Sequence, residues 1–463
     1  MPTYAIFFFS VILYKLGLAS LDINYADGTS KNLVYSISNY GQVPYGANIS
    51  GELMISIPLN ACDPVKSTGD LSLSHRKHQE HFALLAVRGN CTFMAKTAFA
   101  QELGASLLIV VDNIIEMTEN ITPMSLNEDD NRNYYIPTLL ISKNDGDFIL
   151  EKAKNNMDIS FNVNFEMKKS SQVKFSFWIT SSSNQSFSLV KSFKNNYKKI
   201  MESQFQNISF EAHYTGLFHC KFCNFTDYTY FPDNCISGGR YCSAYPEESH
   251  PSLGVYYILE DLRELCLYKS EISIWWNYLS EFEEKCLNMD PKSYENCSLM
   301  IIRSLEKDLQ ITDLEKRIQT CFNSSFVLGA NDKEIDIFAN DNLFLKEERR
   351  VSIENGIGFW PSVTINNDSY KGNLNGDLIF SAICQVFEEK PNFCLIEEEK
   401  NDELINKNII IMVLMLIVFI LCVTLIIYCS KYKKIKESKM KALEISEIIG
   451  RYQVLNEEKH NRA

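Results

Sequence analysis

The sequence lacks an excess of positive charge. Its 463 residues contain 45 Lys and Arg against 58 Asp and Glu, which gives a net charge of -13. Proteins that bind nucleic acid through the phosphate backbone present clustered Lys and Arg side chains, so this composition argues against a nucleic-acid ligand. Only residues 430–463 are basic, with nine Lys and Arg against five Asp and Glu. Such a segment suits anionic lipid headgroups.

The sequence also lacks the motifs of common hydrolases. It contains no HExxH and no GxSxG, and its C-terminal segment has no Cys and His array that would bind zinc. His75, His78 and His81 have roughly helical spacing, but we interpret them as a solvated surface run rather than as zinc ligands. We therefore expect no enzyme, no metal site and no cofactor.

One long apolar run is present near the C-terminus. Residues 409–428 contain no charged residue and no Asn, Gln, Gly or Pro. A helix of ~20 apolar residues crosses the hydrocarbon core of a membrane. Four lysines follow the run and acidic residues precede it, which predicts a cytosolic C-terminus. A buried helix of a soluble protein is the alternative that we favour less.

The amino terminus is consistent with secretion. Residues 5–14 form an apolar run that is too short to span a membrane, and small residues follow it. We predict a signal peptide over residues 1–20, cleaved near Ala19 or Ser20. No Lys or Arg precedes the apolar run, so the α-amino group alone supplies the usual positive charge. Together the two apolar segments predict a type I membrane protein.

Cysteine usage indicates an oxidising compartment. Of 14 cysteines, Cys422 and Cys429 lie in or beside the predicted span, which leaves an even number outside it. Asn-x-Ser/Thr sequons are frequent before the span and absent after it. We predict N-glycosylation at eight of them: Asn48, Asn120, Asn184, Asn207, Asn224, Asn296, Asn323 and Asn367.

Residues 21–170 have the pattern of a small α/β domain. Residues 82–87, 107–111 and 135–141 are predicted strands, and residues 93–103 are a predicted helix. The sequence FALLAVRGNCTFMAKTAFAQELGASLLIVVDN resembles a protease-associated domain. This resemblance implies a peptide-binding or regulatory module that is not itself a catalyst.

Residues 171–397 have a different composition, with ten cysteines between Cys220 and Cys394. Residues 173–179 and 208–214 are predicted strands around a helix at residues 187–200, and a helical, disulfide-rich insert follows. A strand, a turn, a strand and a helix come after Pro361. This order resembles a thioredoxin-like fold. The resemblance implies a cis peptide bond at Pro361, although a trans proline that opens a strand is the alternative.

Cys220 and Cys223 form a CxxC sequence, the spacing of a redox pair. In a thioredoxin-like fold such a pair follows the first strand, but that place here reads TSSSNQS, residues 180–186, without cysteine. We therefore favour structural disulfides. A membrane-tethered thiol-disulfide oxidoreductase that uses Cys220 and Cys223 stays open as the alternative.

A closer resemblance extends over most of the chain before the span. The segments PDNCISGGRYC, LEDLRELCLY, WWNYLSEFEEKC, FWPSVTINNDSYKGNL and AICQVFEEKPNFCL resemble the central region of plant-type vacuolar sorting receptors. NYGQVPYGANISGEL resembles the start of the protease-associated domain of that family. The family has EGF-like repeats before its membrane span, whereas Cys394 here stands only 15 residues before residue 409. The chain is thus identified as a receptor of this type without such repeats.

The resemblance implies a function as well as a fold. It implies a sorting receptor of the Golgi, the trans-Golgi network and endosomal or prevacuolar compartments, with a possible homodimer. Such a receptor binds soluble vacuolar or lysosomal cargo by short peptide determinants and recruits clathrin adaptors for delivery to a vacuolar, lysosomal or storage compartment. A cell-surface interaction protein without cargo cycling is a further alternative.

The RGxCxF stretch of these receptors resembles a loop that clamps an extended cargo peptide. Gly89 would allow close backbone approach, Arg88 would order the loop or meet peptide carbonyls, and Cys91 would be bonded to Cys62. In the alternative interpretation Arg88 and Phe93 shape a turn and begin a helix. The residues implied in cargo binding are Arg88, Gly89, Asn90, Cys91 and Phe93.

Two hypotheses accompany this loop. Asn90 begins a sequon, and because a glycan there would obstruct a peptide, we predict that Asn90 is unmodified. His75, His78 and His81 precede the loop, and imidazoles titrate across the pH range of the secretory compartments. We expect their protonation to help release cargo.

The C-terminal tail carries two patterns of sorting signals. Tyr452 and Leu455 frame a Tyr-x-x-Φ tetrapeptide, which an adaptor can bind in extended form. Glu444 with Ile448 and Ile449 resembles an acidic di-leucine signal, although these residues fit one face of a short helix equally well. The predicted domains are a signal peptide (1–20), a protease-associated domain (21–170), a thioredoxin-like domain (171–397), a stalk (398–408), a transmembrane helix (409–428) and a cytosolic tail (429–463).

Overall fold

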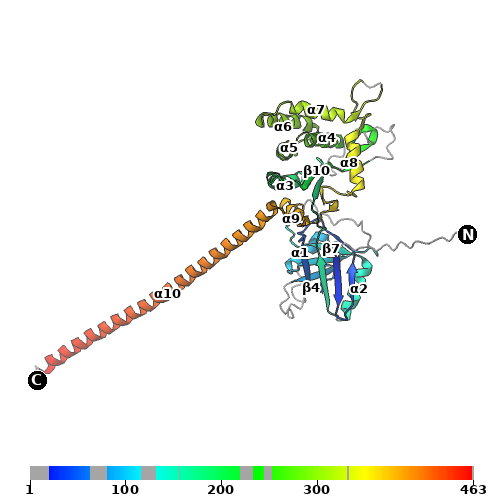
Figure 1. Ribbon diagram of the computed structural model, residues 1–463. Coiled ribbons are helices and arrows are strands. Elements are labelled where there is room, and N and C mark those ends of the chain that lie inside the picture. The colour runs from blue at the N-terminus through cyan, green and yellow to red at the C-terminus, as the bar shows by residue number, and fades with distance from the viewer. Residues whose placement is uncertain are drawn as a thin grey trace. The chain divides into compact units, whose positions relative to one another are not determined.

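The computed structural model describes residues 20–62, 81–115, 132–155, 157–218, 233–243, 253–330 and 333–460. The chain divides into two compact units, Met1–Pro391 and Asn392–Ala463. The first unit contains two α/β domains in sequence, and the second contains the helix α10, Asn392–His460 (Figure 1). Residues 1–19 of the predicted signal peptide lie outside the described residues.

The first domain is built on a mixed sheet of eight strands in the order β2-β1-β8-β4-β5-β6-β7-β3. Strands β4 to β7 are parallel to one another, whereas β1, β2, β3 and β8 join the sheet in antiparallel pairs. The strands are β1 Ser20–Tyr25, β2 Ser30–Leu33, β3 Tyr35–Ile37, β4 Asn48–Ile55, β5 Phe82–Val87, β6 Leu107–Val111, β7 Thr138–Ile141 and β8 Ile159–Asn164. The helices are α1 Phe93–Glu102 and α2 Lys143–Lys154.

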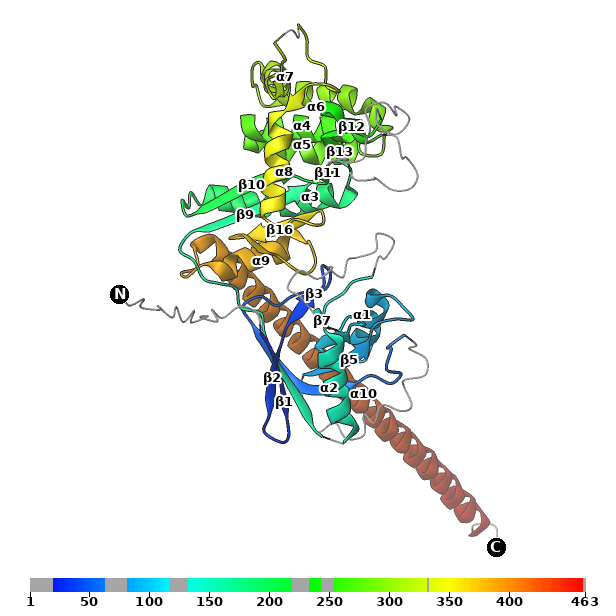
Figure 2. The ribbon, with the colours of Figure 1, turned by 90° about the vertical axis from the view of Figure 1, so that its right-hand side faces the viewer.

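Both faces of this sheet are buried, because α1 and α2 belong to different hydrophobic clusters. Figure 2 shows the two helices beside the strands of this sheet. Leu85 of β5 packs in the cluster that contains Ile149 of α2, and the adjacent Leu84 packs in the cluster that contains Phe99 of α1. Successive side chains of a strand point to opposite faces, so a strand covered on both sides needs a continuous apolar run. The sequences FALLAV of β5 and LLIVV of β6 meet that requirement.

The second domain has a four-stranded sheet in the order β10-β9-β16-β17. Strand β10 is parallel to β9, and β16 is antiparallel to β9. The peptide bond between Trp360 and Pro361 is cis, as the thioredoxin-like resemblance implies. Asn366 and Asn367 both have positive φ angles in the turn between β16 and β17. The elements are β9 Val173–Ile179, α3 Asn184–Glu202, β10 Ile208–Tyr214, β16 Ser362–Ile365, β17 Asp368–Ser369 and α9 Gly376–Val386.

A largely helical insert separates β10 from β16, as the sequence predicted. Helix α4 buries one face, on which Ile258, Leu262 and Leu265 are at most 1% exposed. Among the described residues of the insert, three disulfides tie it together: Cys235–Cys242, Cys266–Cys321 and Cys286–Cys297. Cys384 and Cys394 are also disulfide-bonded. The elements of the insert are β11 Leu217–Phe218, β12 Cys235–Ile236, β13 Tyr241–Ser243, α4 Gly254–Ser270, α5 Ile272–Lys285, α6 Tyr294–Asp308, α7 Leu314–Ser324, β14 Phe326–Val327, β15 Asp341–Asn342 and α8 Leu343–Glu354.

The second unit is a candidate membrane-spanning helix. Within α10, Leu414–Arg451 is long enough to cross a membrane, and its most apolar window has a mean hydropathy of 2.5. This stretch includes most of the predicted span at residues 409–428. The helix is also continuous through residues 398–408, which we predicted to be a stalk.

Candidate functional site

The segment Arg88 to Cys91, called the RGNC loop below, lies where parallel strands of the first domain end. β4, β5 and β6 are neighbours and run in the same direction, so the segments that follow them meet at one edge of the sheet. Ligands of open α/β sheets bind at the carboxyl ends of the strands. The location of residues 88–92 directly after β5 is therefore suited to binding.

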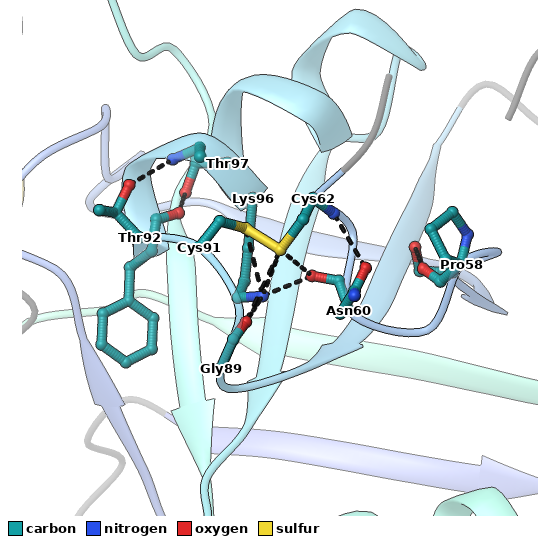
Figure 3. The surroundings of a disulfide bond; sticks show 11 residues. Pro58, Asn60, Cys62, Gly89, Cys91, Thr92, Lys96 and Thr97 are labelled. Atoms are coloured by element: carbon teal, nitrogen blue, oxygen red, sulfur yellow. Dashed lines mark hydrogen bonds between the residues drawn. A yellow bond between two sulfur atoms is a disulfide. The ribbon is translucent and has the colours of Figure 1, made fainter. Parts of the chain in front are cut away.

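The loop makes a tight turn that a disulfide closes. Gly89 has a φ of 113°, and open space surrounds the position where a Cβ atom would be. Asn90 follows with a φ of 67°, and its side chain is exposed. The disulfide between Cys62 and Cys91 is present, with Cα atoms 5.8 Å apart (Figure 3). Two successive residues with positive φ are tolerated because the ends of the turn are held.

Arg88 pairs with a carboxylate that comes from the neighbouring strand. Its Nη1 atom lies 2.7 Å from Oδ1 of Asp112, whose side chain is 0% exposed against 42% for Arg88. The backbone N–H of Asn113 donates to the same oxygen at 2.7 Å. Oδ2 of Asp112 is buried and has no hydrogen-bond partner among the described residues. The Arg88 guanidinium therefore compensates the buried charge of Asp112, while part of the guanidinium itself reaches the surface.

Phe93 links the loop to the helix that follows. It is the first residue of α1, and the hydroxyl of Thr92 caps this helix by accepting from the N–H of Ala95 at 3.1 Å. The Arg88 guanidinium carbon lies 5.3 Å from the centroid of the Phe93 ring. The structure thus brings all five expected residues together. It also gives Arg88 and Phe93 the turn-shaping contacts of the alternative interpretation.

Two residues at this site were missed from the sequence. Asp112 directly follows the apolar strand β6, and this placement could have indicated it. Lys96 is 0% exposed and donates to the carbonyl oxygens of Asn60 and Gly89, the latter at 2.8 Å. Its position one turn after Thr92, among buried residues of α1, was the only signal in the sequence.

The histidines ahead of the loop are only partly described. His75 and His78 lie outside the described residues. His81 is exposed, and its Nδ1 lies 2.9 Å from Oγ of Ser106. Among the described residues, no group of three or more His, Cys, Asp or Glu could hold a metal ion.

The place of a thioredoxin redox pair is occupied by hydroxyl residues that bind a buried carboxylate. Oδ1 of Asp261 accepts from the backbone N–H of Ser181 at 2.6 Å. Oδ2 of Asp261 accepts from the hydroxyl of Thr180 at 3.0 Å. Burial raises the pKa of Asp261 to about 7, against the lowering effect of these hydrogen bonds. Residues 180–186 carry no thiol. Cys220 and Cys223 lie outside the described residues.

The predicted signals of the tail all lie within α10. Glu444, Ile448 and Ile449 are exposed. The backbone of Tyr452 and Leu455 is helical as well. This conformation matches the helical alternative for Glu444 and the two isoleucines, and it differs from the extended form in which an adaptor would take residues 452–455.

Six predicted glycosylation sites are described, and all of them are accessible. Their side chains are exposed, as a glycan requires. Asn120 and Asn224 lie outside the described residues. The exposed sites are Asn48, Asn184, Asn207, Asn296, Asn323 and Asn367.

Family models match both domains of the first unit. The model of the vacuolar sorting receptor thioredoxin-like domain matches residues 173–384, and the model of the PA domain matches residues 49–149. The class is therefore that of proteins that join a PA domain to a vacuolar sorting receptor thioredoxin-like domain. By these two domains, the chain is similar to the vacuolar sorting receptors.

Curated vacuolar-sorting receptors are similar to this chain over most of its length. Vacuolar-sorting receptor 3 of Arabidopsis thaliana is 27% identical over 405 residues, which cover 81% of this chain and 60% of the relative. Vacuolar-sorting receptor 1 of Pisum sativum is 28% identical over 403 residues, with the same coverage. The chain thus spans about 60% of the length of these relatives. A solved structure of Mycobacterium tuberculosis DsbA is 11% identical with a TM-score of 0.28, covering 48% of this chain and 86% of DsbA.

Proposed function

We propose that the chain is a type I transmembrane sorting receptor. Its PA domain binds soluble cargo by short peptide determinants in the Golgi lumen, and its tail recruits clathrin adaptors. The cargo is then delivered to a vacuolar, lysosomal or storage compartment. The relation to vacuolar sorting receptors supports this role.

The observation that carries the proposal is the form of the RGNC loop. It is exposed at the carboxyl edge of the parallel strands, and its base is held by the Cys62–Cys91 disulfide and by the pair of Arg88 and Asp112. A loop held rigidly before binding loses little conformational entropy when a peptide is bound. Function on such domains is concentrated in loops that a rigid scaffold positions.

The structure supports the oxidoreductase alternative less. The position after β9 holds Thr180 and Ser181 bound to Asp261, an arrangement without a nucleophilic thiol. Alkylation of the full chain with and without prior reduction tests the remaining pair, Cys220 and Cys223. Accessible thiols at these two residues would favour the redox function.

Affinity capture tests the receptor function directly. The lumenal segment, immobilised at neutral pH, is expected to retain soluble hydrolases or storage proteins from a secretory-pathway extract. A variant in which Gly89 is replaced by Val, which disfavours the observed φ of 113°, is expected to retain none of them. Equal capture by both proteins would contradict the assignment of cargo binding to this loop.

A further inference from the structure

Lys96 is a buried charge that the proposed function leaves unexplained. Its residue is 0% exposed, although lysines are almost never fully buried unless they are paired. It belongs to α1, and its own N–H donates to the carbonyl of Thr92, the N-cap residue, at 3.2 Å. The helix therefore positions the side chain of Lys96 beneath the RGNC loop.

The ammonium of Lys96 lies where two loops meet. It donates to the carbonyl oxygen of Asn60, in the segment after β4, and at 2.8 Å to that of Gly89, in the segment after β5. It also lies 3.4 Å from Sγ of Cys62 and 3.6 Å from Sγ of Cys91. Figure 3 shows the side chain reaching the disulfide from the helix, with the two carbonyls on either side of its nitrogen.

These two carbonyls take their donor from outside the sheet. Ala61 has a φ of 51° and Asn90 a φ of 67°. The residue after each carbonyl is therefore not extended, and the carbonyl does not continue the hydrogen-bonding pattern of the sheet. Asn60 is half-buried and Gly89 is exposed. A carbonyl that is not paired in a sheet takes its donor from a side chain or from water, and Lys96 supplies that donor here. An ammonium has three N–H donors, so one lysine satisfies both carbonyls at once.

The disulfide alone does not fix this geometry. It joins residues 62 and 91 at the ends of the two segments, and its sulfur atoms carry no hydrogen to donate to the carbonyl oxygens of Asn60 and Gly89. The N–H of Ala61, in the same peptide group as the Asn60 carbonyl, donates to the carbonyl of Pro58 at 2.9 Å. The ammonium restrains the two carbonyl oxygens themselves. The covalent bond thus sets the distance between the loops, and the ammonium sets the orientation of the backbone that faces a ligand.

We propose that Lys96 is a positioning residue of the cargo site, whose ammonium joins the Asn60 and Gly89 carbonyls and so holds both loops in the form that accepts an extended peptide. This inference rests on the proposed function of the RGNC loop. It adds a contact between the loops after β4 and β5, so the segment before Cys62 becomes part of the site.

The test compares Lys96→Met with the wild-type full chain and with Lys154→Met, which changes an exposed lysine at the end of α2. One measurement is amide hydrogen exchange in residues 57–62 and 88–92. The other is the affinity for the heptapeptide that the wild-type chain selects most strongly from a random phage-displayed library. We expect at least tenfold faster exchange and at least tenfold weaker affinity for Lys96→Met, with neither change for Lys154→Met. Exchange in β6 should stay the same in all three proteins.

The outcomes separate the inference from the proposed function. Unchanged loop exchange in Lys96→Met would overturn the inference, and so would faster exchange with unchanged affinity. A wild-type chain that selects no peptide would overturn the proposed function, while the exchange data would still decide whether Lys96 orders the loops. If Lys96→Met does not fold, Lys96→Gln replaces it. Because its amide can donate to both carbonyls without a charge, we expect smaller losses in the same two measurements, and no loss would overturn the inference.

Discussion

The Nη1 atom of Arg88 lies 2.7 Å from Oδ1 of Asp112, and this pair joins the ends of the neighbouring strands β5 and β6. The carboxylate is completely buried, whereas the guanidinium is partly exposed. Replacing Arg88 therefore changes two things together: the surface of the proposed cargo site and the compensation of a buried charge.

The stability of the first domain should depend on this pair. Arg88→Met leaves the Asp112 carboxylate buried without its partner, and we expect a loss of about 2 kcal/mol in the free energy of opening of β5 and β6. Adding Asp112→Asn to that variant removes the charge and should restore most of the loss. Native-state hydrogen exchange of the β5 and β6 amides measures both. Exchange that is unaltered by Arg88→Met would show that the pair contributes nothing to stability.

The second domain should gain stability on acidification through Asp261. Burial raises the pKa of its carboxyl to about 7 in the folded domain, against an ordinary value of 3.8, so the folded form binds the proton more tightly. The free energy of unfolding should then rise as pH falls from about 7 towards 4, by at most about 1.4 kcal/mol per pH unit. Asp261→Asn should remove this contribution, and the exposed change Glu284→Gln should not. Denaturant titrations at several pH values give the slopes, and identical slopes for wild type and Asp261→Asn would contradict the prediction.

The long-range disulfide of the insert should stabilise more than the short-range one. Cys266–Cys321 has a sequence separation of 55 residues, against 7 for Cys235–Cys242. By chain entropy, removal of these bonds costs roughly 4 and 2 kcal/mol, respectively. Guanidinium denaturation of the two double-alanine variants checks the order. A larger loss for the short loop would show that chain entropy is not the dominant contribution.

Asn90 should carry no glycan in the mature protein. Its φ is 67°, the next residue is disulfide-bonded, and the Thr92 hydroxyl is engaged as the cap of α1. A sequon fixed in this way is poorly available once the loop has folded. Glycopeptide mass spectrometry should show Asn90 empty and Asn48 occupied.

Release of the disulfide provides the matched comparison for Asn90. Cys62→Ser leaves the sequon intact, frees Cys91 and should raise the occupancy of Asn90. High occupancy in the wild type would count against the loop as the cargo site, because a glycan there would cover it.

The main strands could be predicted from sequence because their residues follow a clear apolar or alternating pattern. β5, β6, β9 and β10 begin and end at the predicted residues, since each is a compact apolar or alternating run bounded by polar residues. The strand predicted at residues 135–141 instead begins at Thr138. Pro137 lacks an N–H to donate to the sheet, so pairing starts after it.

The contacts of the site could not be predicted in the same way. A lysine within a helix ordinarily reads as exposed, and the burial of Lys96 depends on the carbonyl of Asn60, 36 residues earlier in the chain. Asp112 likewise pairs with Arg88, which lies 24 residues earlier in the chain. Sequence patterns report which face of an element is apolar, but they do not report which distant backbone group a polar side chain will meet.

The continuous helix α10 has a consequence for the tail. Residues 452–455 cannot be helical and extended at the same time, so an adaptor that takes the extended form competes with the helix for the same four residues. The apparent affinity of such an adaptor equals its affinity for an unwound tail multiplied by the fraction of tails that are unwound. Gly450, a poor helix former, lies two residues before Tyr452 and favours local unwinding. If residues 452–455 act as the proposed adaptor signal, its strength depends on how readily the end of this helix frays.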